Sequence, residues 1–585
     1  MITKSIKSLF VACSLCCGGA AALALTACAD WDDHYDANKA LLDSQQSTLW
    51  QNIEKSGNLS QFATLLKKAG YDEVLNTSQC YTVWAPANGT FDYETLSSLA
   101  DDRLQKEFIE NHIARNNYPA SGQYNQPQRI YTLNEKLMYI SGGNGNYAIQ
   151  GISVAQPNLA SENGTIHILD GKIPFKQNIY ESLNNYEFTI DSISNFFHSY
   201  DVRKLNEYKS IQGPTLNGEI TYLDSIFDES NDLFRQYFAY INREDSNYSM
   251  VLPTNEAWIK AKETVSKYYN YLPSFEFMEN TSTGSDQKKV KVNIKDINYL
   301  KDSIVNTMLT SSLFFNNNIY DNRKLDSYSG SGSFVCDSLY ATTGMKIYSE
   351  DAARLLEGTR RLERSNGYVW LTDDSLRMRT WSVWNPEIKI QAENTAYIAS
   401  TSNVYNNEPQ RIYVAPGTQN PAVTGSLSAN SYLEVQSVST NTNQGVVFYL
   451  PDVRSTTYSI YMVMVPAVIT STNNPAKPNH FTVTMGYAKA DGTNEDSNRS
   501  WISESAFVND SLQIDTVYLG DFTFPMAYYG TGNYYPYLRV NSYIMSRDRN
   551  LYDRTLRIDC IILRPKELDD YLKAHPDYLY DQGNY

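Results

Sequence analysis

The sequence predicts a multidomain chain in which two α+β domains are followed by an all-β sandwich of the jelly-roll type. One pair of strand motifs occurs twice, at a spacing far longer than the repeats of solenoids or propellers, which indicates duplication of a whole domain. Helical patterns come before strand patterns, as in α+β domains with local hairpins. From about residue 385, short β-branched and aromatic runs follow one another without a helical pattern between them, which favours a sandwich.

The duplicated motif has the same parts in both copies. An aromatic residue opens a strand that ends in Pro-x-Asn, and a later strand begins with Asn-Gly and ends with Asp. The first copy occupies residues 81–88 and 163–170, and the second occupies 248–258 and 366–373. An Asn side chain after the proline can hydrogen-bond its own backbone, so the motif also predicts a tight turn after the first strand.

This double motif resembles the fasciclin (FAS1) adhesion domain, and the resemblance implies a binding protein rather than an enzyme. It covers residues 47–177 as the first domain and residues 178–384 as a less faithful second domain. The interval from Pro86 to Gly164 is 78 residues, whereas that from Pro253 to Gly367 is 114, so the second domain carries an insertion. Candidates for the added length are the regions 282–288 and 330–332.

Fasciclin domains place adhesion surfaces near these motifs. The resemblance therefore makes four residues candidates for contact with a partner, namely Asn88, Thr90, Asp170 and Asn255. Turn chemistry alone is the alternative explanation of the two asparagines.

Two histidines of the first domain, His112 and His167, are interpreted as buried structural residues. Neither has an acidic or cysteine partner at metal-ligand spacing, and fasciclin domains hold histidines at both positions. The alternative is a catalytic or metal-binding pair. The second domain lacks both, with Asn306 or a neighbour expected in place of the first and Trp370 in place of the second.

Sequence signals predict the helices and strands of the first domain. Asn58 and Gln61 have capping-box spacing at the start of a helix that Gly70 ends. A strand is expected over residues 80–85 and an amphipathic helix from about Asp102 to Arg115. Further strands are expected over residues 136–141, 147–154 and 165–173.

The N-terminus has the pattern of a secretory signal peptide over residues 1–27. Two lysines precede an apolar run from Leu9 to Ala27, and the chain turns acidic after Cys28. The run Leu-Thr-Ala-Cys that ends at Cys28 resembles a bacterial lipobox, which implies that Cys28 carries the lipid. A transmembrane anchor is the alternative, but the run is near the short end for a bilayer and no basic cluster follows it.

Residues 28–46 are expected to form an acidic tether. An acidic stretch directly behind a lipidated cysteine resembles the surface-export signal of Bacteroidota lipoproteins. It implies a lipid-anchored protein of the outer membrane that faces the cell exterior. A solvated linker and the periplasmic face are the alternatives.

Residues 385–566 are expected to form the sandwich, and residues 567–585 a tail that packs as a helix or hangs free. The runs 388–393 and 556–563 resemble the first and last strands of galactose-binding-like carbohydrate modules. Between two strands lies a glycine-jointed aromatic segment that is a candidate glycan platform, since tyrosine rings can stack on sugars. The candidate ligand-binding residues are Tyr528, Tyr529, Asn533, Tyr534, Tyr535 and Tyr537. An ordinary strand connection is the alternative.

Composition limits the partners and the chemistry. The formal net charge of -16 argues against nucleic acid or anionic lipid. Cys80, Cys336 and Cys560 have no disulfide or metal-ligand spacing, so no cofactor is expected. The oxygen-rich stretch 491–496 departs from the EF-hand order and is expected to be a plain hairpin. Known enzyme motifs are missing from the sequence, although its many carboxylates leave a glycosidase pair open.

These observations together predict a non-enzymatic surface lipoprotein that binds a ligand. By analogy with Bacteroidota surface machinery, it is expected to assist glycan capture beside a TonB-dependent transporter and its starch-binding-type surface lipoprotein. The alternative function is adhesion or protein scaffolding through the fasciclin-like domains, without a small ligand.

Overall fold

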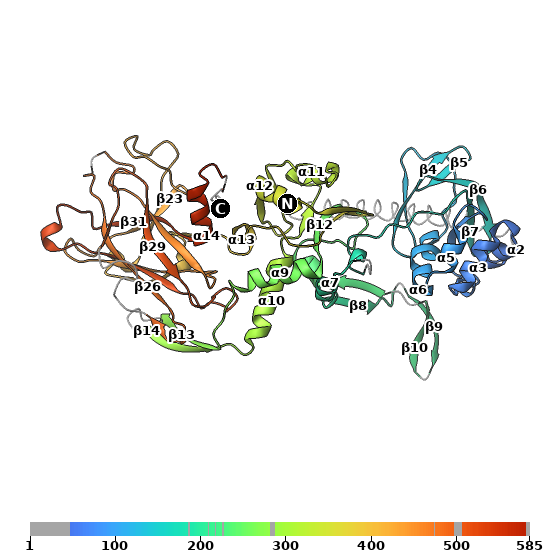
Figure 1. Cartoon of the computed structure of the whole chain (residues 1–585), viewed down its shortest axis with the longest axis horizontal. Coiled ribbons are helices and arrows are strands. Elements are labelled where there is room, and N and C mark those ends of the chain that lie inside the picture. The colour runs from blue at the N-terminus through green and yellow to red at the C-terminus, as the bar shows by residue number, and fades with distance from the viewer. Residues whose placement is uncertain are drawn as a thin grey trace, which may run out of the picture. The chain divides into compact units, whose positions relative to one another are not determined.

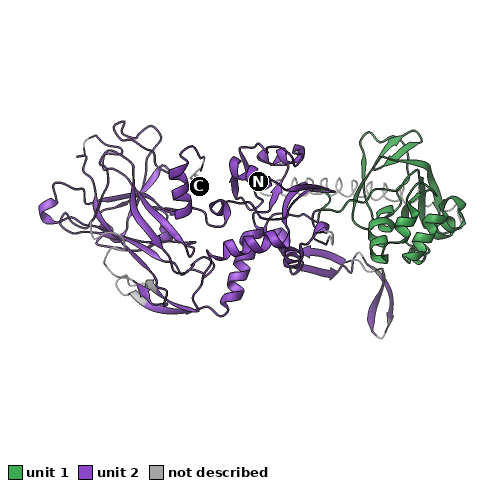
Figure 2. Cartoon of the chain, in the orientation of Figure 1, with its two compact units in different colours: residues 1–178, 243–245 green, residues 179–242, 246–585 purple. Residues whose placement is uncertain are grey.

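The computed structural model describes residues 47–184, 188–208, 210–216, 218–224, 227–280, 287–472, 474–495, 506–578 and 580. The chain forms two compact units, residues 1–178 with 243–245 (unit 1) and residues 179–242 with 246–585 (unit 2) (Figure 2). The predicted signal peptide, the lipidation site Cys28 and the acidic tether lie outside the described residues. Within the described part, every helix is too short or too polar to cross a membrane.

Unit 1 contains the first domain, in which helices pack against a seven-stranded sheet of order β2-β1-β7-β6-β5-β4-β3. Apolar side chains of the first helices and of the central strands share one core. The helices are α2 (Leu49–Lys55), α3 (Ser60–Lys68), α4 (Tyr71–Val74), α5 (Tyr93–Ser97) and α6 (Asp101–Leu104). The strands are β1 (Tyr81–Pro86), β2 (Ile113–Arg115), β3 (Gln128–Tyr131), β4 (Leu137–Gly143), β5 (Asn146–Ile149), β6 (Ile152–Ser161) and β7 (Gly164–Leu169).

The predicted helix from about Asp102 to Arg115 is wrong in its last three residues, which form a strand. After α6, a π-helical turn and a 3-10 turn carry the chain to His112, and β2 begins at Ile113. Ile113 pairs with Val83 in an antiparallel ladder. The open edge of β1 therefore takes the last residues of the helical pattern into the sheet, because the edge strand needs hydrogen-bond partners.

The strand predicted over residues 147–154 is two strands, β5 and β6. Gln150 and Gly151 both have positive φ, 49° and 79°, and form the turn between them. The strand predicted to end at Ile173 ends at Leu169.

Unit 2 begins with a second α+β region up to residue 384, called here the second domain. Its main sheet has the order β15-β12-β19-β18, and four further two-stranded pairs lie outside this sheet (Figure 1). The helices of eight or more residues are α7 (Asp191–His198), α9 (Asn255–Ser266), α10 (Ile297–Thr310) and α12 (Ser349–Leu356), and the shorter ones are α8 (Asp232–Gln236), α11 (Lys324–Ser327) and α13 (Thr380–Val383). The sheet strands are β12 (Tyr248–Pro253), β15 (Phe314–Asn316), β18 (Arg360–Arg364) and β19 (Gly367–Thr372). The strands of these pairs are β8 (Asp201–Leu205), β9 (Ile211–Leu216), β10 (Glu219–Asp224), β11 (Phe227–Asn231), β13 (Ser274–Asn280), β14 (Gln287–Asn293), β16 (Ser338–Tyr340) and β17 (Lys346–Tyr348).

The duplicated motif forms the same parallel strand pair in both domains. Tyr81 lies opposite Gly164 in one pair, and Tyr248 lies opposite Gly367 in the other. A Cβ atom on Gly164 would lie 1.8 Å from the carbonyl oxygen of Tyr81, and one on Gly367 would lie 1.8 Å from that of Tyr248. The glycine of each Asn-Gly is thus required by the close approach of the two backbones.

The remainder of unit 2 is a sandwich of two six-stranded antiparallel sheets whose apolar side chains form one core. One sheet contains β20 (Ile388–Gln391), β22 (Gln410–Tyr413), β23 (Ser431–Val435), β25 (Thr457–Met464), β29 (Asp515–Thr523) and β31 (Leu556–Pro565). The other contains β21 (Ile398–Ser402), β24 (Gly445–Tyr449), β26 (His480–Ala488), β27 (Asn494–Glu495), β28 (Phe507–Val508) and β30 (Tyr537–Ser542).

The first and last strands of the sandwich are neighbours, with Ile388 opposite Leu563. The start of the predicted tail is a helix, α14 (Lys566–Ala574). Of the two alternatives for the tail, packing as a helix is therefore the one observed up to residue 574.

Candidate functional site

The Pro-x-Asn turn of the first domain closes the start of a helix that is distant in sequence. Asn88 Oδ1 accepts a hydrogen bond from the Gln61 amide of α3 at 3.0 Å, and its Nδ2 donates to Gly57 O and Ser60 Oγ, each at 2.9 Å. The predicted capping box led by Asn58 is wrong, since Asn58 lies inside a 3-10 turn before α3. A side chain from another part of the chain satisfies one of the free helix amides instead.

Asn255 caps the start of a helix in the second domain in the same way. Its Oδ1 accepts from the Ser192 amide of α7 at 2.9 Å, and its backbone N–H donates to Thr189 O at 2.7 Å. The Thr90 hydroxyl, in the first domain, donates to Ala87 O at 2.7 Å, whereas Asp170 is exposed. The two asparagines thus have a structural role, and partner contact through the four predicted residues stays a prediction.

Both histidines of the first domain are fully buried and hydrogen-bonded. His112 donates from Nδ1 to Phe108 O at 2.7 Å and accepts at Nε2 from the Ile173 amide at 2.9 Å. His167 accepts at Nδ1 from the Asn158 amide at 3.2 Å and donates from Nε2 to Tyr118 O at 3.0 Å. Burial lowers the pKa of each imidazole to about 4, so both rings are neutral structural links, as the sequence predicts.

The second domain replaces these histidines with apolar side chains. Trp370 occupies the register position of His167, as predicted. The expected replacement of His112 by Asn306 is wrong. Ile113 and Phe314 hold equivalent positions in the sheet edge, so the residue before each is equivalent, and His112 corresponds to Leu313.

The predicted glycan platform in the sandwich is largely covered by protein. Tyr528 is 2% exposed and its hydroxyl accepts from the Ala488 amide at 2.6 Å. Tyr537 is 5% exposed, and its ring lies so close to Gly486 that a Cβ there would be 1.9 Å from Cζ. The Tyr528 ring belongs to the sandwich core, and the Tyr537 ring is buried in a separate small cluster with Val447. The assignment of these two rings to a ligand platform is therefore wrong.

Tyr529 and Tyr534 are half-buried against residues of the second domain. Tyr271 donates from its hydroxyl to Tyr529 O at 2.8 Å. The ring of Tyr534 lies 6.1 Å from that of Phe275 and 5.3 Å from that of Phe277. The tyrosine segment therefore forms, within unit 2, a seam between the second domain and the sandwich, and we call this contact region the seam.

The insertion of the second domain supplies the other side of the seam. The hairpin β13–β14 spans the predicted region 282–288, of which residues 281–286 lie outside the described part. Figure 1 shows the hairpin beside the sandwich, where Glu276 donates from its amide to Gly492 O at 2.8 Å and accepts from the Asn494 amide at 3.1 Å. Phe275 is 1% exposed and belongs to the sandwich core.

The C-terminal residues add a second connection between the same two parts. Glu567 accepts from the hydroxyls of Tyr268 and Thr380, each at 2.7 Å. Tyr578 donates to Asp351 Oδ2 at 2.6 Å, where the carboxylate is 1% exposed. Burial is the main cause, and the Asp351 carboxylate the second, of a pKa of the Tyr578 hydroxyl above its ordinary value. This phenol therefore stays a neutral donor.

Two residues of the predicted platform stay accessible. Asn533 is exposed, and Tyr535 is half-buried with its ring 5.9 Å from that of Tyr449. Ligand binding by these two residues remains a prediction.

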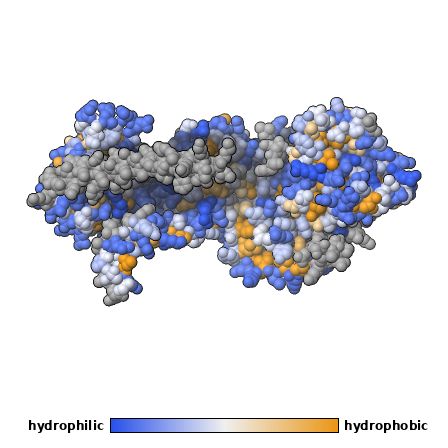
Figure 3. Space-filling model, turned by 180° about the vertical axis from the view of Figure 1, so that it is seen from behind, coloured by the Kyte–Doolittle hydropathy of each residue, from blue (hydrophilic) through white to orange (hydrophobic). Residues whose placement is uncertain are grey.

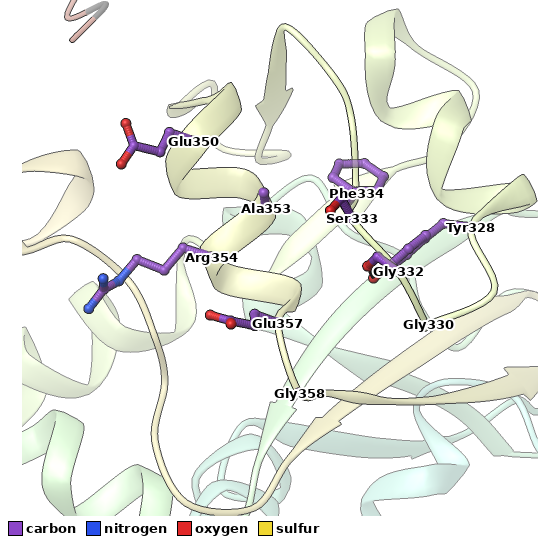
Figure 4. A pocket seen from close by; sticks show the side chains of 10 residues that line it. All are labelled: Tyr328, Gly330, Gly332, Ser333, Phe334, Glu350, Ala353, Arg354, Glu357 and Gly358. Atoms are coloured by element: carbon purple, nitrogen blue, oxygen red, sulfur yellow. Dashed lines mark hydrogen bonds between the residues drawn. The ribbon is translucent and has the colours of Figure 1, made fainter.

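A cavity of about 530 Å³ opens in the second domain between α12 and the loop 328–334 (Figure 4). Tyr328 and Phe334 form an aromatic wall opposite Ala353 of the helix. In Figure 4 the charged ends of Glu350 and Arg354 point away from that wall. Glu350 pairs with Arg379 at 3.6 Å. The cavity thus combines apolar walls with a charged rim and has no converging set of reactive groups among its lining residues.

Metal-binding groups are sparse in the described residues, where no three His, Cys, Asp or Glu side chains gather around one point. A small oxygen-rich cluster lies where the first and last strands of the sandwich pair. Ser428 Oγ lies 2.8 Å from both Asp559 Oδ1 and Gln391 Oε1, so the two acceptors share its one hydroxyl hydrogen. The Ser428 amide donates to Asp559 Oδ2 at 3.1 Å. Burial raises the pKa of Asp559 to about 6, and the nearby Glu393 adds to the shift.

The three cysteines of the described chain are free thiols. Cys336 and Cys560 are buried, and Cys80 is half-buried. Burial raises the pKa of Cys80, and it raises that of Cys336 to about 12. Thiols with raised pKa values are poor nucleophiles at neutral pH.

Residues 57–173 match the family model of the fasciclin domain, so the first domain is a FAS1 domain. No curated protein matches the chain. The family model covers the first domain alone, and the second domain is related to it through the shared register described above.

Among solved structures, the chain is similar to a FAS1 domain pair from the insect cell adhesion molecule Fasciclin I, at 14% identity over 56% of this chain and 99% of that one, with a TM-score of 0.19. It is also similar to Paenibacillus xanthan lyase, at 16% identity over 31% of this chain and 14% of that one, with a TM-score of 0.18. A family 35 carbohydrate-binding module from Clostridium thermocellum matches at 10% identity over 30% of this chain and 96% of the module, with a TM-score of 0.15. With identities and TM-scores this low, the family model is what identifies the first domain.

Proposed function

We propose that this protein is a non-enzymatic binding protein of the cell surface, anchored by a lipid on Cys28 in the outer membrane and facing the exterior. It captures a ligand, with a glycan as the first candidate, beside a TonB-dependent transporter and its starch-binding-type surface lipoprotein. The FAS1 domain supports binding, because domains of this kind are associated with adhesion. The jelly-roll assignment of the sandwich, and the comparison with galactose-binding-like modules, belong to the same proposal.

The seam is the observation that carries this proposal. Its tyrosines and the inserted hairpin join the second domain to the sandwich through buried rings and backbone hydrogen bonds. Binding proteins gain affinity when their surfaces are held rigidly before the ligand arrives. A rigid body of this size suits the presentation of a fixed surface to a ligand or to a neighbouring membrane protein.

Adhesion or scaffolding through the fasciclin-like domains is the second candidate. It is favoured by unit 1, which is a compact body of its own and contains the FAS1 domain. In this alternative the exposed Asp170 contacts a protein partner, and no small ligand is bound.

Glycan binding by the full mature chain is the first test. We expect at least one neutral polysaccharide on an array to bind, and complete lack of binding would contradict glycan capture. Co-purification of the lipidated protein from its native membrane tests the transporter partner, and the protein scaffold would be favoured if a partner were recovered without glycan binding. Release of sugar products from mixed polysaccharides would contradict the non-enzymatic assignment.

Cys28→Ser tests the anchor. We expect this variant to lose the lipid and to leave the membrane fraction, and surface proteolysis of intact cells separates the outer face from the periplasmic face.

A further inference from the structure

Tyr320, in the second domain, has a backbone conformation that is costly for an aromatic residue. Its φ is 45°, in the left-handed region. Among the described residues, twelve non-glycine residues have positive φ, and ten of them are Asn, Asp, Glu or Gln. Phe238 and Tyr320 are the two aromatic exceptions. A left-handed conformation costs an L-residue about 1–2 kcal/mol, least for Asn and Asp.

The strain at Tyr320 is not repaid by burial of its ring. Tyr320 is 69% exposed, so its side chain gains little from the hydrophobic effect. Backbone strain of this kind persists where the surroundings impose it and where the position serves a function. A ring that costs stability and stays in solvent is therefore a candidate contact for something outside the chain.

The surroundings of Tyr320 fix the ring against a second tyrosine. Asn322 is fully buried, donates from Nδ2 to Tyr340 O at 2.8 Å and accepts from the Tyr340 amide at 2.9 Å. It also donates to Asn316 O at 3.1 Å, so the turn that holds Tyr320 is tied to β16. The rings of Tyr320 and Tyr340 are consequently 4.6 Å apart, with 36° between their planes.

The rim of this pair is polar. Asn318 and Arg323 are exposed, and Arg323 donates from Nε to Asn318 O at 2.9 Å. Asp321 is half-buried and lies 3.7 Å from Lys324. A pyranose unit presents a C–H face to an aromatic ring and hydroxyls to its surroundings, which fits two tyrosines with amide and charged neighbours. The centre of a protein interface is poor in charged groups by comparison.

We propose that Tyr320 and Tyr340 form a stacking platform for a pyranose unit of a neutral glycan. This inference rests on the proposed function, because it locates the glycan site of the same protein. It moves that site from the covered tyrosines of the sandwich to an exposed edge of the second domain. On the face seen in Figure 3, hydrophilic residues predominate.

Tyr320→Gly gives the sharpest test, because glycine takes the left-handed conformation without strain. The full mature chain is screened on a neutral-polysaccharide array, and the best oligosaccharide is titrated by calorimetry. We expect Tyr320→Gly to weaken binding at least tenfold while its unfolding midpoint stays the same or rises. Tyr340→Ala should weaken binding by a similar factor.

Tyr299→Ala is the matched control, since Tyr299 is 74% exposed on the helix α10 and has ordinary helical backbone. Its variant should bind like the parent protein. Unchanged glycan binding in both Tyr320→Gly and Tyr340→Ala would overturn the platform and leave the proposed function standing. If the parent chain bound no glycan, the platform and the proposed glycan capture would both be wrong. Loss of a protein partner in Tyr320→Gly, without any glycan binding, would overturn the glycan assignment in favour of a protein contact.

Discussion

The two copies of the duplicated domain place their buried indole on opposite strands of the same pair. In the first domain Trp84 of β1 lies opposite His167 of β7, and the two rings stack with centroids 6.1 Å apart. In the second domain Val251 of β12 lies opposite Trp370 of β19. Both indoles are fully buried. The core keeps one large ring and one smaller side chain, and the strand that carries each has changed.

This difference separates what the fold demands from what it tolerates. The glycines and the asparagines recur because backbone atoms meet there and helix amides need an acceptor. The rings change because a core accepts substitutions that preserve its total volume. The histidines of the first domain could be lost in the second for the same reason, once Leu313 and Trp370 filled their places.

Gly164→Ala and Gly367→Ala should destabilise their domains more than any other substitution proposed for the two copies. Each adds a Cβ that would lie 1.8 Å from a carbonyl oxygen, so each should cost roughly 4 kcal/mol or prevent its domain from folding. Proteolysis and chemical denaturation would measure the loss. Gly145→Ala and Gly344→Ala are controls, because φ is positive there but nothing lies within 4 Å, and they should cost about 1 kcal/mol. If Gly367→Ala left stability unchanged while Gly164→Ala did not, the backbones of β12 and β19 would not need the close approach that β1 and β7 need.

Phe275→Ala should separate the second domain from the sandwich. Removing a ring that is 1% exposed in the seam should cost about 3 kcal/mol, because it leaves a cavity between the two parts. Calorimetry should then resolve two transitions where unit 2 otherwise unfolds as one. Lys291→Ala, at an exposed position of the same hairpin, is the control. An unchanged calorimetric profile would contradict the role of the insertion.

Acid should destabilise the first domain through its two histidines. Their pKa values are about 4 in the folded state and about 6.5 when unfolded, so the unfolded state binds more protons as pH falls below 6.5. Stability is then lost down to about pH 4, by about 2 kcal/mol per histidine at pH 5. Hydrogen exchange, corrected for its intrinsic pH dependence, should show the loss in unit 1. Equal loss in the sheet of the second domain would refute this origin.

Asn88→Ala and Asn255→Ala should have the smallest effects, about 1–2 kcal/mol each. Asn88 makes three side-chain hydrogen bonds at the start of α3, so its loss should cost more than that of Asn255. Urea denaturation compares the two. Asn88→Asp and Asn255→Asp keep the side-chain oxygen that accepts from the helix amide, so they should be more stable than the Ala variants. If they were not, the hydrogen bonds donated by Nδ2 would be the important ones.

Local signals predicted the parts of the fold that depend on the backbone. The Asn-Gly pairs marked the start of the second strand in each copy, and the recurring Pro-x-Asn marked the turns. The partner of Asn88 was missed because it lies far back in the sequence, where Asn58 offered a plausible local cap. Asn306 was expected at the position equivalent to His112 because the sequence does not show how β2 pairs with β1. Only the sheet gives that register.

The site was predicted less well, for a different physical reason. Tyrosines that face a sugar and tyrosines that face another domain have the same sequence pattern, because both need a flat apolar ring with a polar tip. Phe275, which covers Tyr534, comes from an insertion more than two hundred residues earlier. The strain at Tyr320 also left no signal, since φ cannot be read from a single tyrosine.

The contacts of α14 and Tyr578 with the second domain have a consequence for the timing of synthesis. Asp351 of the second domain finds its partner in Tyr578, and Arg379 donates to the hydroxyl of Tyr571 at 2.9 Å. These tyrosines leave the ribosome long after the sheet of the second domain is complete in sequence. These contacts of the second domain therefore cannot form until Tyr571 and Tyr578 have left the ribosome, about two hundred residues after its sheet.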